Sequence, residues 1–207
     1  MADLVSGRYG QLSPFQSLLG NLAGSVQGNL PVRSNLEYLG YSGATDGAAL
    51  VTNKLICVPV PVDIGATYKT VTFHAGATSP TLTHNYAAVY SGVTGAGTSS
   101  LLLAQSTDAT STAPTISQLN SYTLASPVTA TPTNAPNGYW YVGLQQTGTA
   151  NSAAAATVAT AVQLLSAAVA TAAPVSLGFS VAATTGTAPA NLASPTPVSV
   201  IPFIWLS

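Results

Sequence analysis

The chain has 207 residues, of which 47% are apolar and only 4% are charged, and its formal net charge is −1. Ordinary soluble domains carry a charge at about 25% of their positions, so Thr, Ser, Asn, Gln, Gly and Ala replace charged residues here. The four basic residues are scattered along the first third and form no patch, which excludes nucleic acid as a partner. Such a surface makes contacts that respond little to salt, which suits a protein packed into an assembly.

The clearest helix signal is the stretch QLSPFQSLLGNLAG at residues 11–24. Ser13 suits the N-cap, and Pro14 suits the first helical position. The apolar residues that share one face at helical spacing are Phe15, Leu18, Leu19 and Leu22. Because so short a helix is unstable alone, the sequence predicts an N-terminal arm, residues 1–34, whose helix anchors the chain to another protein. The alternative is a helix that folds back onto its own domain.

Residues 35–207 have the pattern of one β-sandwich domain. The segments that resemble strands, each bounded by Gly, Pro, Ser, Thr or Asn, are 53–62, 68–76, 84–92, 100–106, 118–128, 138–146, 175–183 and 197–207. About eight short strands at this spacing predict an all-β fold, an antiparallel β-sandwich with jelly-roll-like topology. Since proline has no N–H to donate, we expect the prolines of these segments at sheet edges or bulges: Pro59, Pro61, Pro197 and Pro202.

An alanine-rich excursion from the sandwich is expected at residues 150–174. Its uncharged stretch AAAATVATAVQLLSAAVATAAPV is long enough to cross a membrane. It consists mostly of Ala and Thr, contains Gln163 and has no flanking Lys or Arg, so we expect no membrane insertion. An apolar helical stripe is present but the threonines disfavour a helix, so a surface loop and a segment ordered by a neighbouring subunit both stay open.

Residues that carry enzyme chemistry are few. The five acidic residues lie far apart, so a carboxylate pair can form only by folding: Asp3, Glu37, Asp46, Asp63 and Asp108. No G-x-S-x-G nucleophile motif is present. The glycine-rich stretch GVTGAGTSS is followed by no lysine and no helix pattern, which indicates a hairpin loop and not a phosphate-binding loop. We therefore predict a protein that is not an enzyme, with no catalytic residue and no cofactor.

Metal binding is not expected either. His74 and His84 are ten residues apart beside predicted strands, and no third ligand lies near them in sequence. Hydrogen-bonded histidines on a strand face are the expected outcome. Cys57, the single cysteine, lies in an apolar strand, so we expect a buried structural thiol and no intrachain disulfide.

Three consecutive aromatic residues occur in the stretch NGYWYVGLQQ. Alternate side chains of a strand point to opposite faces, so Tyr139 and Tyr141 share one face and Trp140 takes the other. Tyr86 and Tyr90, four residues apart, also share a face and can extend this cluster. One face is expected to be core, and the other can present an interaction surface for a sugar or a partner chain. The alternative is that all three consecutive rings are buried.

Several segments taken together resemble a known family. They are YKTVTFHAG, then HNYAAVYSG and SLLLAQSTD, then YTLASPVTATPTNAPNGYWYVGLQQTG. This succession resembles the small β-sandwich domains of tailed-bacteriophage virion proteins, especially the minor tail proteins of actinobacterial phages. The resemblance covers about residues 50–146 and leaves out the N-terminal arm and the alanine-rich stretch.

The resemblance implies a structural role in a phage particle, without catalytic residues or a cofactor. We expect a minor tail or tail-tip protein attached by its arm; the alternative is a capsid decoration or head-fibre protein, and the further alternative is a carbohydrate- or receptor-binding module. The expected partners are other capsid or tail proteins and further copies in a homo-oligomer such as a trimer, with a host-surface glycan as a further candidate. The N-terminus lacks a basic region followed by an apolar core, so we expect no secretory signal and a virion location, reached by assembly in the host cytoplasm and release with the particle.

Overall fold

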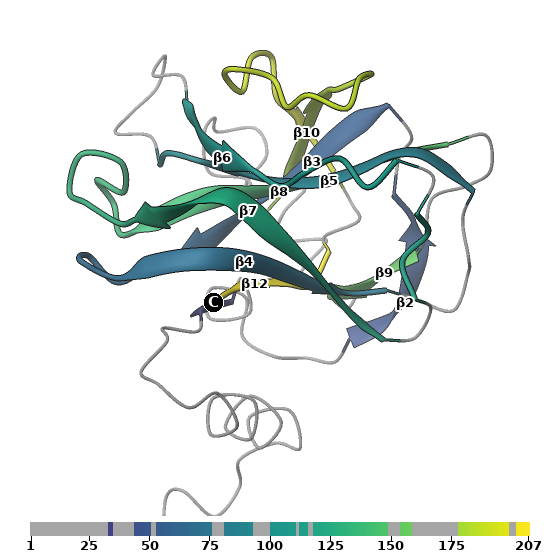
Figure 1. Ribbon diagram of the computed structural model, residues 1–207, viewed down its shortest axis with the longest axis horizontal. Coiled ribbons are helices and arrows are strands. Elements are labelled where there is room, and N and C mark those ends of the chain that lie inside the picture. The colour runs from purple at the N-terminus through teal and green to yellow at the C-terminus, as the bar shows by residue number, and fades with distance from the viewer. Residues whose placement is uncertain are drawn as a thin grey trace, which may run out of the picture.

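The computed structural model describes residues 33–34, 44–50, 53–75, 81–92, 100–110, 112–115, 118–148, 154–158, 178–198 and 202–207. Within these ranges the regular elements are twelve β-strands and no helix (Figure 1). The predicted all-β class is therefore confirmed for the described part of the chain. The anchoring helix predicted from Phe15, Leu18, Leu19 and Leu22 lies outside the described residues, as does most of the alanine-rich excursion.

The strands form two larger antiparallel sheets and one small one. The four-stranded sheet has the order β1 (Arg33–Ser34), β12 (Ile204–Leu206), β4 (Thr67–His74) and β7 (Leu119–Thr129). The six-stranded sheet has the order β11 (Thr196–Pro197), β10 (Phe179–Ala182), β3 (Lys54–Pro61), β8 (Tyr139–Gly148), β5 (Leu82–Tyr90) and β6 (Leu102–Gln105). The two-stranded sheet pairs β2 (Ala44–Ala49) with β9 (Ala154–Val158).

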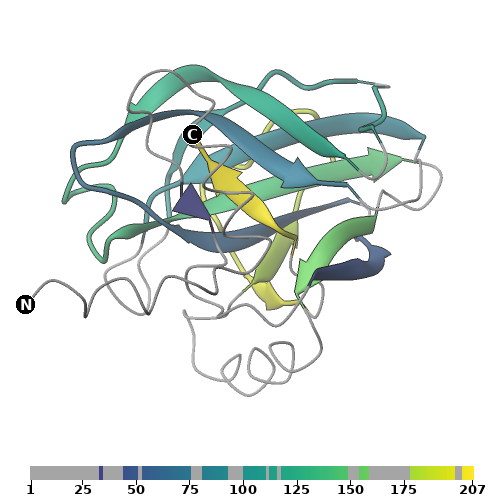
Figure 2. The same ribbon diagram turned by 90° about the horizontal axis from the view of Figure 1, so that it is seen from below.

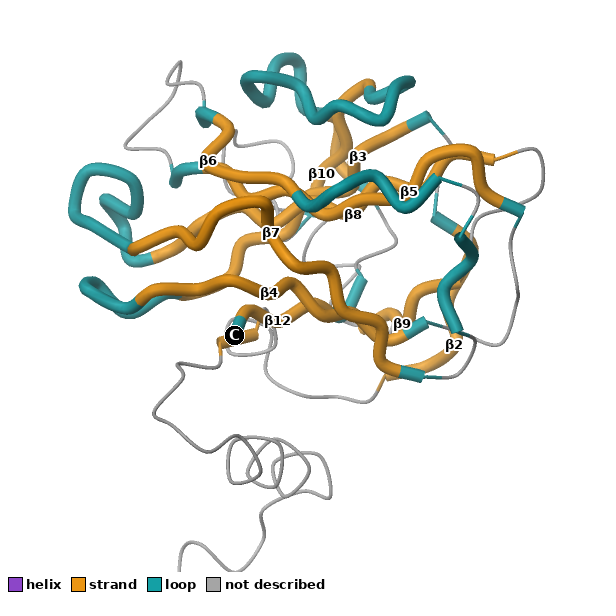
Figure 3. The backbone as a smooth tube through the Cα atoms, in the orientation of Figure 1, coloured by secondary structure: helices purple, strands orange, loops and turns teal. Residues whose placement is uncertain are grey.

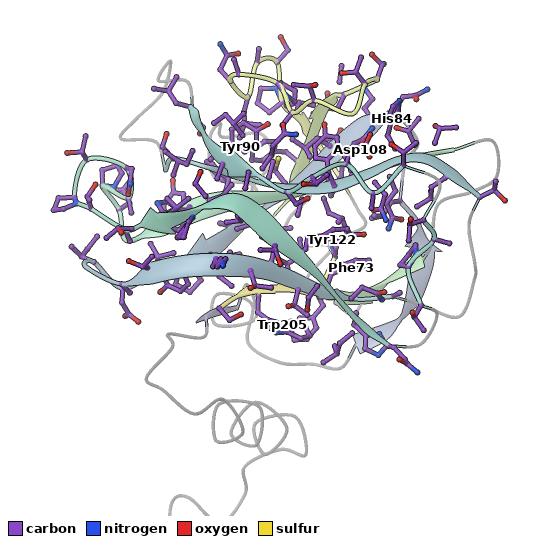
Figure 4. All side chains as sticks on the ribbon, viewed as in Figure 1. Phe73, His84, Tyr90, Asp108, Tyr122 and Trp205 are labelled. Atoms are coloured by element: carbon purple, nitrogen blue, oxygen red, sulfur yellow. The ribbon has the colours of Figure 1, made fainter. Side chains whose placement is uncertain are left out.

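The two larger sheets lie face to face with a hydrophobic core between them, and Figure 1 shows them one above the other. In Figure 2, which is seen from below, the same sheets overlap. Tyr68 of β4 meets Trp140 of β8 edge to face, with ring centroids 5.6 Å apart. Phe73 and Tyr122, on the neighbouring strands β4 and β7, stack with centroids 5.7 Å apart, and Figure 4 shows both rings in the space between the sheets. This is a sandwich-like arrangement of antiparallel sheets, whereas the jelly-roll topology stays a prediction.

Strand β8 lies inside the six-stranded sheet and is buried on both of its faces. All residues from Trp140 to Gln146 are buried, although an antiparallel strand with one solvated face would alternate. The inner face of β8 packs in the core between the sheets. Its outer face therefore needs a separate cover.

That cover is the chain that follows β10. Residues 183–192, here called the strap, cross the outer face of the six-stranded sheet as a loop, which Figure 1 shows in yellow-green above β10 and β3 and Figure 3 draws in teal. A second hydrophobic cluster lies beneath it, formed by strap and sheet residues that include Ala183, Ala188, Leu192, Tyr86, Tyr90, Tyr141 and Phe179. The described fold thus has a third layer that the sequence did not predict.

The prolines of β3 occupy a part of the strand that β10 does not pair with. Strand β10 pairs with β3 only from Lys54 to Cys57, whereas Pro59 and Pro61 lie beyond that ladder. Pro197 belongs to β11, the two-residue edge strand of the same sheet. These positions agree with the expectation that proline occurs where no N–H is needed for a ladder.

Candidate functional site

The five aromatic residues predicted as an interaction surface take three different positions. Trp140 points into the core between the sheets and is fully buried. Tyr86, Tyr90 and Tyr141 face the strap and are at most 3% exposed. Tyr139 is the one ring of the five that is only partly buried.

Contacts with neighbouring rings and with the strap hold the buried tyrosines. Tyr141 lies edge-on to Tyr139 and to Phe179, with centroids 5.3 and 4.9 Å apart. The Tyr90 hydroxyl donates a hydrogen bond of 2.9 Å to the Pro189 carbonyl of the strap. The strap and the inner core therefore cover four of the five predicted rings, Tyr86, Tyr90, Trp140 and Tyr141. These four rings do not form an open surface on which a ligand can stack. A role for Tyr139 in partner contact stays a prediction.

A histidine–carboxylate pair lies at the opposite end of the outer face. His84 of β5 and Asp108, which follows β6, are joined by a contact of 2.6 Å between Nδ1 and Oδ2, and Figure 4 shows them side by side near the strap. The backbone N–H of Asn85 donates to the other carboxylate oxygen at 2.8 Å, and the Thr110 hydroxyl donates to Oδ2 at 3.1 Å. The expectation of hydrogen-bonded strand histidines is confirmed for His84.

These donors make Asp108 an anion at neutral pH. Partial burial raises the pKa of its carboxyl group, but the hydrogen bonds from Asn85, His84 and Thr110 and the charge of His84 outweigh burial. The pKa therefore lies below its ordinary value. Since the carboxylate accepts at Oδ2, His84 donates from Nδ1 and is held in one orientation.

The strap approaches this pair so closely that only glycine fits. A Cβ atom on Gly186 would lie 2.1 Å from Oδ2 of Asp108 and 3.0 Å from Nδ1 of His84. Gln105 of β6 holds the same stretch, because its Oε1 accepts the Ala188 N–H at 2.8 Å. Three separate parts of the chain, β5, the turn after β6 and the strap, thus meet at the pair.

On the inner face, the same end of β5 carries a buried polar contact. The Tyr122 hydroxyl of β7 donates to Oδ1 of Asn85 at 2.5 Å, and Asn85 Nδ2 donates to the Thr112 carbonyl at 3.1 Å. Burial raises the pKa of Tyr122, so its hydroxyl stays protonated as a donor. This contact joins the two larger sheets through a polar link beside the apolar core.

The chemistry of the pair is that of an oriented histidine. In enzymes that use a nucleophile activated by a histidine base, a carboxylate often binds one ring nitrogen and orients the histidine. His84 and Asp108 reproduce that part of the arrangement. Among the described residues, no serine, threonine or cysteine is hydrogen-bonded to the other ring nitrogen of His84. The geometry supports a structural role for the pair, which links β5, the turn after β6 and the strap. The absence of enzyme activity stays a prediction.

The sequence did not reveal this site. His84 and Asp108 are 24 residues apart, and no motif in the sequence links them. Their meeting depends on how β6 and the following turn return along β5, which no local pattern encodes. Gly186 in the strap is the one feature of the sequence that hints at this site, because an isolated glycine can mark a place where the backbone approaches other atoms closely.

Other predicted features can be placed as well. Cys57 is buried and forms no disulfide, as expected, and burial raises the pKa of its thiol. Among the described residues, no three or more His, Cys, Asp or Glu side chains gather as they would to hold a metal ion. Over the same residues, no helix has the length and apolar character to cross a membrane.

No protein-family model, no curated protein and no solved structure matches the chain significantly. Its function therefore has to be inferred from the residues and their geometry.

Proposed function

We propose that this chain is a non-enzymatic structural component of a phage particle, a minor tail or tail-tip protein attached by its N-terminal arm. Its jelly-roll-like sandwich packs against other virion proteins, which include further copies of the same chain. A capsid decoration or head-fibre protein is the alternative form of this role. The proposal needs no catalytic residue and no cofactor.

The observation that supports this proposal is a row of hydroxyl side chains on β4 and β7, two strands in which Lys69 is the one Lys, Arg, Asp or Glu. Three cross-strand pairs, here called the hydroxyl ladder, consist of Thr67 with Thr129, Thr70 with Thr123 and Thr72 with Ser121. In the first and third pairs the two hydroxyl oxygens are 2.8 Å apart. Because the hydroxyls of these two pairs bond to each other, part of their hydrogen-bonding capacity is already satisfied within the sheet.

A face of this kind suits permanent packing against protein. Burying a charge at an interface costs free energy unless the charge is paired, and the six ladder residues carry no charge. Lys69 of β4 is exposed, and its flexible side chain can keep its charge at the edge of a contact. The chain from residue 109 to residue 207, which supplies β7, β8, β10, β11, β12 and the strap, contains no Asp, Glu, Lys, Arg or His. Contacts made by these elements are expected to be insensitive to ionic strength.

Copy number per particle tests the proposal. We expect deletion of residues 1–34 to lower the number of copies in purified particles by about tenfold or more, as measured by quantitative mass spectrometry. Thr123→Lys should lower it as well, because it places an unpaired charge on the ladder. Ile64→Lys, at a turn residue that is 51% exposed, is the matched control and should leave the copy number unchanged. Unchanged incorporation of the deletion variant would contradict attachment by the arm.

A second candidate role, contact with a host-surface glycan, has its own observation. Tyr139 is partly exposed and lies opposite Pro61, also partly exposed, in the ladder between β3 and β8. A rigid aromatic ring beside a proline provides a surface on which a sugar ring can stack. Titration with host envelope polysaccharide should show binding that Tyr139→Ala abolishes and Leu119→Ala, at an exposed residue of β7, preserves. If the wild-type protein does not bind, this second role is excluded.

A further inference from the structure

Two polar atoms beneath the strap lack a protein partner. The hydroxyl of Tyr86 and the side-chain oxygen Oε1 of Gln145 are buried and have no hydrogen-bond partner among the described residues, and both residues are 0% exposed. Buried polar groups in native proteins nearly always have a partner, either from the protein or from ordered water. Each group left without one lowers the folding equilibrium constant by about tenfold or more. Two such atoms on directly opposite residues of neighbouring strands therefore point to a bound molecule.

The two residues are neighbours on adjacent strands. Tyr86 of β5 lies directly opposite Gln145 of β8 in the antiparallel ladder, so both side chains leave the same outer face of the sheet. Directly opposite residues have Cβ atoms about 5 Å apart, so the two side chains leave the sheet from neighbouring points. The strap covers this face, with Ala183 and Ala188 in the same hydrophobic cluster as Tyr86.

The surrounding protein groups already have their own hydrogen bonds. Nε2 of Gln145 donates to the Thr147 hydroxyl and, at 3.1 Å, to the Ala183 carbonyl at the start of the strap. The carboxylate of Asp108, whose charge acts on Tyr86, accepts from Asn85, His84 and Thr110. No described residue therefore supplies the missing partner of the Tyr86 hydroxyl and of Oε1 of Gln145.

The chemistry of the two atoms restricts what that partner is. An amide oxygen only accepts hydrogen bonds, whereas a tyrosine hydroxyl both donates and accepts. Burial raises the pKa of Tyr86, and the charge of Asp108 raises it further, so the hydroxyl is neutral. An anion is excluded because Gln145 offers only an acceptor and Asp108 is negative. A small neutral molecule that donates to Gln145 and accepts from Tyr86 has the required pattern, and water is the smallest such molecule.

We propose that one ordered water molecule bridges the Tyr86 hydroxyl and Oε1 of Gln145 and fastens the strap over the outer face. The fastening acts through Gln145, because the same amide group holds the Ala183 carbonyl. With the water in place, both the oxygen and the nitrogen of the Gln145 amide are hydrogen-bonded, so the side chain keeps one orientation. The strap is then held at its first residue by a fixed side chain of β8. The site is separate from the hydroxyl ladder, which lies on the other larger sheet.

A comparison of two Tyr→Phe variants tests the proposal. Tyr90→Phe is the matched control, because its hydroxyl has a known protein partner, the Pro189 carbonyl at 2.9 Å. Both variants should lower the folding constant by roughly three- to tenfold in urea titration, since each removes one satisfied hydrogen bond. If Tyr86→Phe leaves the folding constant unchanged or raises it while Tyr90→Phe lowers it, the hydroxyl of Tyr86 has no bound partner and the proposal fails.

Two further measurements identify the bound molecule. A high-resolution crystal structure should show one solvent peak within hydrogen-bond distance of both atoms; direct contact between Tyr86 and Gln145 would overturn the proposal. The folding constant should be the same in sodium, potassium and choline salts at equal ionic strength. A specific dependence on one cation would overturn water as the occupant.

Discussion

The two faces of the six-stranded sheet are both buried, but in different ways. The inner face packs against the second large sheet through big side chains, among them Trp140, Tyr68 and Phe73. The outer face also carries large rings, but its cover is a loop whose buried apolar contributions are Ala183, Ala188 and Leu192. Hydrogen bonds to Tyr90, Gln105 and Gln145 hold that loop in place.

The difference indicates that the two faces are stabilised by different forces. Burial of large apolar side chains supports the inner face, and its contribution grows with the area removed from water. The strap buries little area of its own, so its position depends on directed polar contacts and on the close approach at Gly186. Substitutions in the inner core should therefore affect the whole fold, whereas substitutions at the strap should affect mainly that loop.

The largest effect is expected for Trp140→Ala. This change removes a fully buried ring that packs edge-on against Tyr68, and it leaves Oδ1 of Asn134 without the indole N–H that donates to it at 3.1 Å. The free energy of unfolding should fall by about 3–5 kcal/mol. Tyr139→Ala, at the partly buried neighbour on the same strand, is the control for urea titration. Equal losses for both variants would contradict the distinction between the two faces.

Gly186→Ala should have the next largest effect. The new methyl group would lie 2.1 Å from Oδ2 of Asp108, an oxygen that hydrogen bonds hold in place, so the strap has to shift. We expect a loss of about 1–3 kcal/mol, with faster amide exchange in the strap than in β8. Thr184→Ala, at an exposed strap residue, should change little. In an Asp108→Ala background the added cost of Gly186→Ala should shrink; an undiminished cost would contradict the proposed clash.

Asp108→Asn should produce a smaller, pH-dependent loss. The folded-state pKa of Asp108 is lowered, so its contribution is present above the ordinary carboxyl pKa and is lost as the pH falls through the folded-state value. At neutral pH the variant should lose about 1–2 kcal/mol of unfolding free energy. The difference from the wild-type protein should vanish in strong acid. A difference that stays constant down to the lowest pH would mean that the carboxylate charge contributes nothing.

The smallest effect on stability is expected for Thr123→Lys in the hydroxyl ladder. Thr123 is exposed and its side chain supports neither of the two hydrophobic clusters, so the unfolding free energy should change by no more than about 0.5 kcal/mol. Thermal unfolding of the isolated protein checks this. A loss above about 2 kcal/mol would mean that this face is covered within the folded chain, and the variant would then not report on assembly.

Elements with a clear local pattern were predicted well from the sequence. The strands expected at residues 53–62, 68–76 and 138–146 correspond to β3, β4 and β8, because alternating or continuous apolar runs bounded by turn residues determine strands locally. The strap could not be predicted, since residues 183–192 have no apolar periodicity and are buried only because aromatic rings lie beneath them. The pair of His84 and Asp108 depends on the path of the chain between β6 and β7, which the sequence does not encode locally.

The accessibility of individual tyrosines tests the central claim, that the strap turns the outer face into a second core. Nitration or iodination of the folded protein, followed by peptide mapping, reports each ring separately. Tyr139 should react readily, whereas Tyr86, Tyr90 and Tyr141, which are at most 3% exposed, should stay protected until the protein unfolds. Reaction of those three rings at the rate of Tyr139 in the folded protein would contradict the claim.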